Sequence, residues 1–110
     1  PFAPGIVTPS DIEASLEHGC KILKFFPAEP SGGLAYLKAM AAPYAHLGLK
    51  FVPLGGLNAK NMASYLADPQ VAALGGSWLA PRDLIKAGEW DKITALAAEA
   101  VQIIKTTRNK

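Results

Sequence analysis

One lysine of this 110-residue sequence lies where its amine could react as a nucleophile. Lys24 is central in residues 21–26, which read as a short strand bounded by Gly19 before it and Pro27 after it. Both sides of this segment are apolar, so we predict a buried parallel strand covered on both faces. An amine kept away from water is more readily neutral and can attack a carbonyl carbon. Alternatively, the lysine stem packs on apolar neighbours while its ammonium reaches water, which is common behaviour for lysine.

Two glycine-rich loops follow later strands and could bind an anion. Gly55-Gly56 follows residues 50–54, and Gly75-Gly76-Ser77 follows residues 71–74. Glycines let backbone N–H groups approach an anion closely, and Ser77 adds a hydroxyl donor. A single Gly-Gly pair is usually only a tight turn, but adjacent parallel strands would deliver both loops to one place. We therefore predict one phosphate site formed by both loops.

The order of elements explains how these residues would meet. Residues 2–7, 21–26, 50–54 and 71–74 read as strands. Helices are expected from an N-cap at Thr8 to Gly19, over 34–42 before Pro43, from an N-cap at Asn58 to Asp68, over 82–87 and over 89–106. Repeated βα units imply an α/β fold with a parallel sheet, and four units are half of a (β/α)8 barrel. An open flavodoxin-like sheet is the alternative, although it typically has five strands.

The apolar spacing of the last helix predicts its buried stripe. That stripe comprises Ile93, Leu96, Ala97, Ala100, Val101 and Ile104, and both tryptophans, Trp78 and Trp90, are expected to be packing residues.

Composition limits the classes of function. Half of the residues are hydrophobic, 18% are charged and the net charge is +2, which indicates one globular domain without the dense basic surface of a nucleic-acid-binding protein. The single cysteine, Cys20, excludes an internal disulfide, and with two separated histidines we expect no metal site. No apolar run approaches the roughly 20 residues of a membrane span, so we expect no membrane partner and a cytoplasmic location. The chain opens without methionine on an apolar segment, which suggests a fragment.

Three sequence blocks resemble one enzyme family. Residues 23–29 (LKFFPAE), the pair Gly55-Gly56 and residues 75–79 (GGSWL) are similar to the 2-keto-3-deoxy-6-phosphogluconate (KDPG) and 4-hydroxy-2-oxoglutarate (KHG) aldolases, class I aldolases of the Entner–Doudoroff pathway. The likeness extends across essentially the whole chain. It implies that residues 1–110 are the C-terminal half of a (β/α)8 TIM barrel, strands 5–8 with their helices.

The resemblance also implies roles for six residues. Lys24 would be the Schiff-base lysine, and Phe26 would line the pocket. The phosphate of a phosphorylated keto acid would be held by Gly55, Gly56, Gly76 and Ser77. Cleavage would give pyruvate and glyceraldehyde 3-phosphate with no metal or cofactor, because the iminium is itself the electron sink. A homotrimer is expected from the same resemblance.

Two departures keep alternatives open. The family's general-base glutamate, and the arginine and threonine that bind the pyruvyl carboxylate, belong to the half of the barrel that this chain lacks, so the chain alone is expected to be incomplete. Leu54 stands where the family usually has threonine, which should alter recognition of substrate hydroxyls. The relative that acts on the galactonate epimer carries an apolar residue there, so that substrate stays open. An inactive half-barrel fragment and a phosphate-binding βα module, favoured if Lys24 is solvated, are the non-enzyme alternatives.

Three other polar residues receive structural interpretations. Glu29 could be a base, but a loop glutamate that caps a helix is expected instead. His18 and His46 are expected to be solvated.

Overall fold

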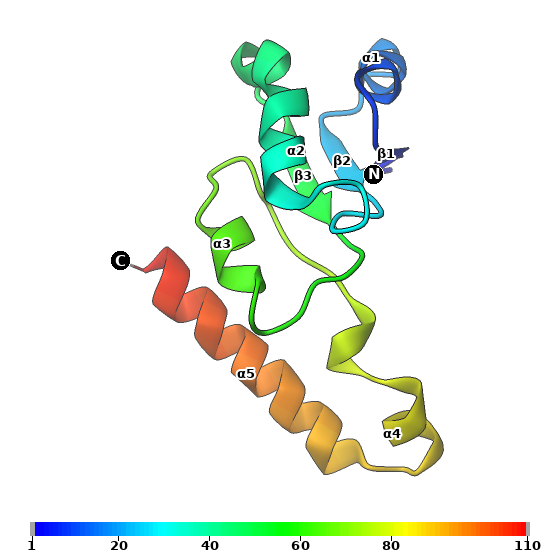
Figure 1. The fold of residues 1–110 in the computed structure, drawn as a ribbon, viewed down its shortest axis with the longest axis vertical. Helices are drawn as coiled ribbons and strands as arrows, with labels where there is room; N and C mark the ends of the chain where they lie inside the picture. Colours follow the sequence, from blue (N-terminus) through cyan, green and yellow to red (C-terminus); the bar gives the residue numbers. More distant parts are fainter. Residues whose placement is uncertain (1, 110) are drawn as a thin grey trace.

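The computed structural model describes residues 2–109 and contains a three-stranded parallel sheet (Figure 1). The strands are β1 (Gly5–Ile6), β2 (Ile22–Phe25) and β3 (Lys50–Pro53), in the order β1-β2-β3. Lys24 of β2 pairs with Gly5 on one side and Val52 on the other. The predicted α/β class with parallel strands is confirmed.

The predicted fourth strand is reduced to one bridge. Val71 pairs in parallel with Phe51, and Ala72 N–H donates to the Phe51 carbonyl at 2.8 Å. Gly75 N–H donates to the Pro53 carbonyl at 3.2 Å, so the segment still runs beside β3. Ala72 and Ala73 are exposed, and their small side chains offer little packing that would hold a regular strand. The prediction of a strand over residues 71–74 is therefore wrong, although the direction of the segment is as expected.

Helices follow the strands at the expected places. They are α1 (Pro9–Glu17), α2 (Gly33–Ala41), the 3₁₀ helix η1 (Ala42–Leu47), α3 (Met62–Leu66), the 3₁₀ turn η2 (Ser77–Leu79), α4 (Arg82–Lys86) and α5 (Trp90–Arg108). The chain does not leave helical conformation at Pro43, because η1 continues where α2 ends and a proline is tolerated in the first helical turn.

The N-cap of α1 is confirmed and that of α3 is displaced. Thr8 Oγ1 accepts from Asp11 N–H at 3.2 Å, and Asp11 Oδ2 accepts from Thr8 N–H at 2.9 Å, which is a capping box. Asn58 instead closes a turn, with its side-chain oxygen accepting from the N–H groups of Lys60 and Asn61. Asn61 is the residue that precedes α3.

The core lies on one face of the sheet only. Leu23, Phe25 and Phe51 are fully buried beneath the helices. On the other face Ile22 is 48% exposed, and Lys24 and Val52 are half-buried. The prediction that β2 is covered on both faces is wrong for the residues described here, because no element of 2–109 packs over the side that carries Lys24.

Helix α5 covers α3 rather than the sheet (Figure 1). Ala100 is buried with Met62 and Leu66, and Ile103 packs beside them. Three members of the predicted stripe, Ala97, Val101 and Ile104, are exposed, and Ile103 was missed. Trp78 packs on the core as expected, whereas the prediction for Trp90 is wrong, since it is 60% exposed.

The long last helix makes the chain extended. Figure 1 shows α1 and α2 near one end of the molecule and α4 with the start of α5 at the other. The radius of gyration is 15.0 Å, whereas a compact domain of this size would have about 13 Å. In the described part of the chain, no helix has both the length and the apolar character that a membrane crossing needs.

Candidate functional site

Lys24 lies on the open face of the sheet, near the C-terminal end of β2. Its ammonium nitrogen is 4.9 Å from the centroid of the Phe26 ring, a cation–π distance. The side chain is half-buried, and Phe26 is 51% exposed. The amine is thus held against an aromatic ring at the edge where the strands end, but it is not enclosed by residues 2–109.

A cavity of about 330 Å³ lies where the strands end. Its walls are formed by Phe26, Leu54, Gly55, Gly56, Leu57, Gly76, Ser77 and Trp78. Five of the six site residues predicted from the sequence therefore line one cavity. The sixth, Lys24, adjoins it through its contact with the Phe26 ring.

The backbone of this cavity carries free hydrogen-bond donors. Within residues 2–109, the N–H groups of Gly55, Gly56, Leu57, Gly76 and Ser77 donate to no protein acceptor. Each of these residues lines the cavity, and none of the residues that line the cavity carries a carboxylate. Successive backbone N–H groups around a concavity are a suitable binding site for an anion.

Glycine is required at three of these positions. Gly55 and Gly56 have φ of 104° and 78°, which side chains rarely adopt. A Cβ atom on Gly76 would lie 2.3 Å from the Trp78 ring. The loops therefore depend on glycine for both backbone conformation and close packing.

Glu29 holds the loop after β2 to the loop after β3. Its Oε1 accepts from the Asn61 side-chain amide at 3.0 Å, and its Oε2 accepts from the Tyr65 hydroxyl at 2.9 Å. Burial, followed by the hydrogen bond and the charge of Glu29, raises the pKa of Tyr65, so the hydroxyl remains a donor across neutral pH. The expectation that Glu29 caps a helix is wrong, because α2 begins after Gly32 without a side-chain cap. A buried tyrosine hydroxyl needs a partner, and this was the signal in the sequence that could have linked Tyr65 to Glu29.

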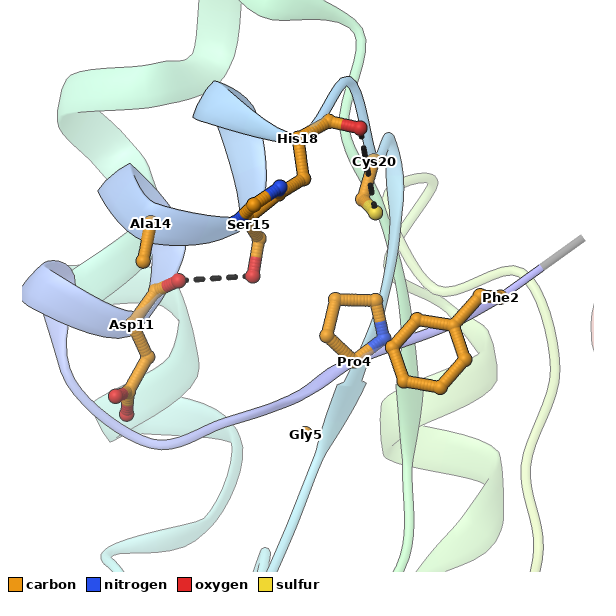
Figure 2. A pocket seen from close by; sticks show the side chains of 8 residues that line it. All are labelled: Phe2, Pro4, Gly5, Asp11, Ala14, Ser15, His18 and Cys20. Carbon is orange, nitrogen blue, oxygen red and sulfur yellow. Dashed lines mark hydrogen bonds between the residues drawn. The ribbon is translucent and has the colours of Figure 1, made fainter.

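A larger cavity of about 570 Å³ lies beside β1 and α1 (Figure 2). Asp11, His18 and Cys20 are among its lining residues. The carboxylate of Asp11 already accepts from two backbone N–H groups, and Cys20 Sγ is 4.0 Å from the His18 carbonyl. His18 and Cys20 precede β2, so this cavity lies toward the N-terminal ends of the strands, away from the edge where active sites of βα barrels occur. No group of three metal-ligating side chains was found among residues 2–109.

Comparison with known proteins gives concordant matches. The sequence profile described as KDPG and KHG aldolase matches residues 1–96. The 2-dehydro-3-deoxy-phosphogluconate aldolase of Treponema pallidum is 45% identical over 104 residues, which are 94% of this chain and 49% of that protein.

Two solved structures match the fold. KDPG aldolase from Legionella pneumophila, with pyruvate captured as a covalent carbinolamine intermediate, aligns with a TM-score of 0.81 and 42% identity over 87% of this chain and 46% of that one. The KDPG aldolase of Zymomonas mobilis with 3-phosphoglycerate aligns with a TM-score of 0.77 and 39% identity over 89% of this chain and 44% of that one. The chain spans about half the length of the relatives that it matches, and its parallel α/β fold corresponds to about half of their barrels.

Proposed function

The chain belongs to the KDPG and KHG aldolase family, and on that premise we propose that it carries the imine-forming and phosphate-binding parts of a class I aldolase. The substrate is 2-keto-3-deoxy-6-phosphogluconate, which is cleaved to pyruvate and glyceraldehyde 3-phosphate. 4-Hydroxy-2-oxoglutarate is a second substrate of the same reaction type. In this proposal the chain supplies strands 5–8 of the barrel that performs the reaction.

Lys24 is the nucleophile in this proposal. Its neutral amine attacks the C2 ketone, and loss of water leaves an iminium. The electron pair of the C3–C4 bond moves toward the iminium and forms an enamine, while a base removes the proton of the C4 hydroxyl and the aldehyde leaves. Protonation of the enamine at C3 and hydrolysis release pyruvate and restore Lys24. The covalent pyruvate adduct in the Legionella enzyme supports this assignment.

One observation carries the proposal. Phe26 joins the two parts of the site, because its ring contacts the ammonium of Lys24 and also lines the cavity with the free N–H groups. A substrate with its ketone at Lys24 would extend past this ring and place its phosphate at Gly55, Gly56, Gly76 and Ser77. The Zymomonas enzyme was solved with 3-phosphoglycerate, a ligand that carries a phosphate, which supports an anion at such a site.

Leu54 bears on which epimer is cleaved. It lines the cavity and offers no hydroxyl, and a Cβ on Gly75 would lie 2.8 Å from its side chain, so glycine leaves room for it. A site without a hydrogen-bonding partner discriminates weakly between positions of a substrate hydroxyl. We therefore include 2-keto-3-deoxy-6-phosphogalactonate as the alternative substrate, to be compared in the same cleavage assay.

Imine trapping tests the assignment of Lys24. The chain is incubated with pyruvate and borohydride, and peptide mass spectrometry locates the reduced adduct. We expect the adduct at Lys24, its loss in Lys24→Met, and its retention in Lys21→Met. Lys21 is a matched control on the same segment, whose amine donates to the Leu47 carbonyl at 3.2 Å instead. An adduct on another lysine, or none at Lys24 when the open face of the sheet is covered by the other half of a barrel, would overturn the proposal.

A further inference from the structure

The loop after β3 is fixed by three of its carbonyl groups. The Leu54 carbonyl accepts from Ala28 N–H at 2.8 Å, and the Gly55 carbonyl accepts from Glu29 N–H at 3.0 Å. The Gly56 carbonyl accepts from the Asn61 side-chain amide at 3.0 Å. All three acceptors are held by residues 28, 29 and 61.

The orientation of these carbonyls determines where the free N–H groups point. The only cis peptide among the described residues is Phe26-Pro27, so the peptides after Leu54, Gly55 and Gly56 are trans. A planar trans peptide directs its C=O and N–H to opposite sides. With three successive carbonyls bound to the Glu29 side, the N–H groups of Gly55, Gly56 and Leu57 are directed away from it, and all three residues line the cavity.

The carboxylate of Glu29 holds this arrangement together without entering the cavity. The same Asn61 amide nitrogen that binds the Gly56 carbonyl also donates to Glu29 Oε1, and Tyr65 fixes Oε2. The space for Glu29 is kept by two glycines: a Cβ on Gly33 would lie 2.6 Å from Oε2, and one on Gly56 would lie 2.7 Å from Glu29 Cβ. Glu29 does not line the cavity, so it acts through the loop.

We propose that Glu29 is a positioning residue for the phosphate site. Its backbone N–H holds the Gly55 carbonyl, and its carboxylate holds Asn61 on the Gly56 carbonyl, so that the N–H groups of Gly56 and Leu57 are directed into the cavity. This inference rests on the proposed function for the identity of the anion. It assigns to Glu29 neither contact with substrate nor proton transfer.

Phosphate titration of the ¹⁵N-labelled chain tests the inference. Inorganic phosphate should shift the amide signals of Gly55, Gly56 and Leu57 in the wild-type chain, together with those of Gly76 and Ser77. Glu29→Ala should raise the phosphate dissociation constant about 10-fold, because charged hydrogen bonds that order the loop are lost. The shift at Leu57 should shrink most, because the carbonyl of its peptide, that of Gly56, is held by Asn61, whereas the backbone N–H of residue 29 still holds the Gly55 carbonyl. Glu29→Gln keeps an oxygen for the Asn61 amide and should recover most of the affinity.

The chain offers a matched control. Glu13 Oε1 accepts from the Tyr44 hydroxyl at 3.0 Å, so Glu13→Ala removes a comparable glutamate–tyrosine pair away from the cavity. It should leave the phosphate dissociation constant within about 2-fold of wild type. Urea unfolding of each variant separates a general loss of stability from a loss of binding. If Glu29→Ala does not fold, Tyr65→Phe removes only the donor to Oε2 and should weaken binding in the same direction.

The outcomes separate this inference from the proposed function. Unchanged phosphate binding in Glu29→Ala, with normal pyruvate trapping at Lys24, would overturn the positioning role alone. A wild-type chain that binds no phosphate at these amides would overturn it as well. Absence of pyruvate trapping even with the open face of the sheet covered, in a protein whose phosphate affinity falls in Glu29→Ala, would overturn the aldolase proposal and leave the positioning role standing.

Discussion

Replacing Gly55 by alanine should destabilise the chain and weaken phosphate binding more than the same change at Gly48, a glycine of positive φ with open space around it. The φ of Gly55 is 104°, and a Cβ there would lie 3.0 Å from both Ala28 N and Pro27 Cα. These neighbours are backbone atoms of the adjoining loop. They cannot rotate away as a flexible side chain would, so the loops after β2 and β3 would have to separate.

The loss in free energy of unfolding has two parts, which a control variant separates. A left-handed backbone costs a residue other than glycine about 1–2 kcal/mol, and alanine offsets about 0.4–1 kcal/mol of this by restricting the unfolded chain. Gly48→Ala measures that net cost alone, because Gly48 has φ of 69° and a Cβ there would meet no atom within 4 Å. Forcing an extra methyl group into a packed position adds about 1–3 kcal/mol at Gly55.

Thermal unfolding of the two variants provides the measurement. Each 1 kcal/mol corresponds to about 4–8 °C for a domain of this size, so Gly55→Ala should melt at least about 4 °C below Gly48→Ala. Only Gly55→Ala should also weaken phosphate binding. Equal melting temperatures for the two variants, with phosphate binding intact in both, would refute the view that the two loops are held in close contact at Gly55.

Two further predictions concern stability in acid and turnover. The N–H of Val7 donates to Asp11 and lowers the pKa of that carboxyl below 3.8, so the ionised carboxylate stabilises the fold above that pH and the stabilisation is lost as the pH falls through the lowered pKa. The free energy of unfolding in urea should therefore fall below about pH 4, and Asp11→Asn should flatten this fall. An equally steep fall in Asp11→Asn would contradict the prediction. The 110-residue chain should trap pyruvate weakly and release glyceraldehyde 3-phosphate slowly, since Glu29 is bound to Asn61 and Tyr65 and a positioned base is typically worth about 10²–10⁴-fold. Adding the half of the relatives' barrel that this chain does not match should restore the rate, and a coupled assay that finds full turnover without it would contradict this.

The sequence predicted the elements whose signals are local. The Thr8 cap and the glycine after α1 are marked by residues a few positions apart, and both are found where expected. The glycine loops were expected to meet because parallel strands end at one edge, and Gly55, Gly56 and Gly76 do line one cavity. The meeting of the two glycine loops was thus predictable from strand order, while the roles of their residues stay predictions.

The errors arose where burial depends on distant contacts. Periodicity indicated that Val101 and Ile104 are core residues, but the face of α5 that packs is set by α3, and Ala100 and Ile103 meet Met62 there. The carboxylate of Glu29 binds Asn61 and Tyr65, which lie 32 and 36 positions further along the chain. Such pairing has no local pattern, because a glutamate, an asparagine and a tyrosine each have ordinary roles where they stand.

The structure separates the two parts of the proposed reaction. The proposed phosphate site would use backbone donors, glycines and Glu29 contacts that all lie within residues 2–109. Lys24 instead shares its face with Ile22 and Val52, which residues 2–109 leave open, whereas the inward side chains of a complete barrel form a packed core. An amine gains nucleophilicity from exclusion of water, so it depends on what covers that face, while anion binding does not. Binding of phosphate and reactivity of Lys24 should therefore respond independently when the open face is covered.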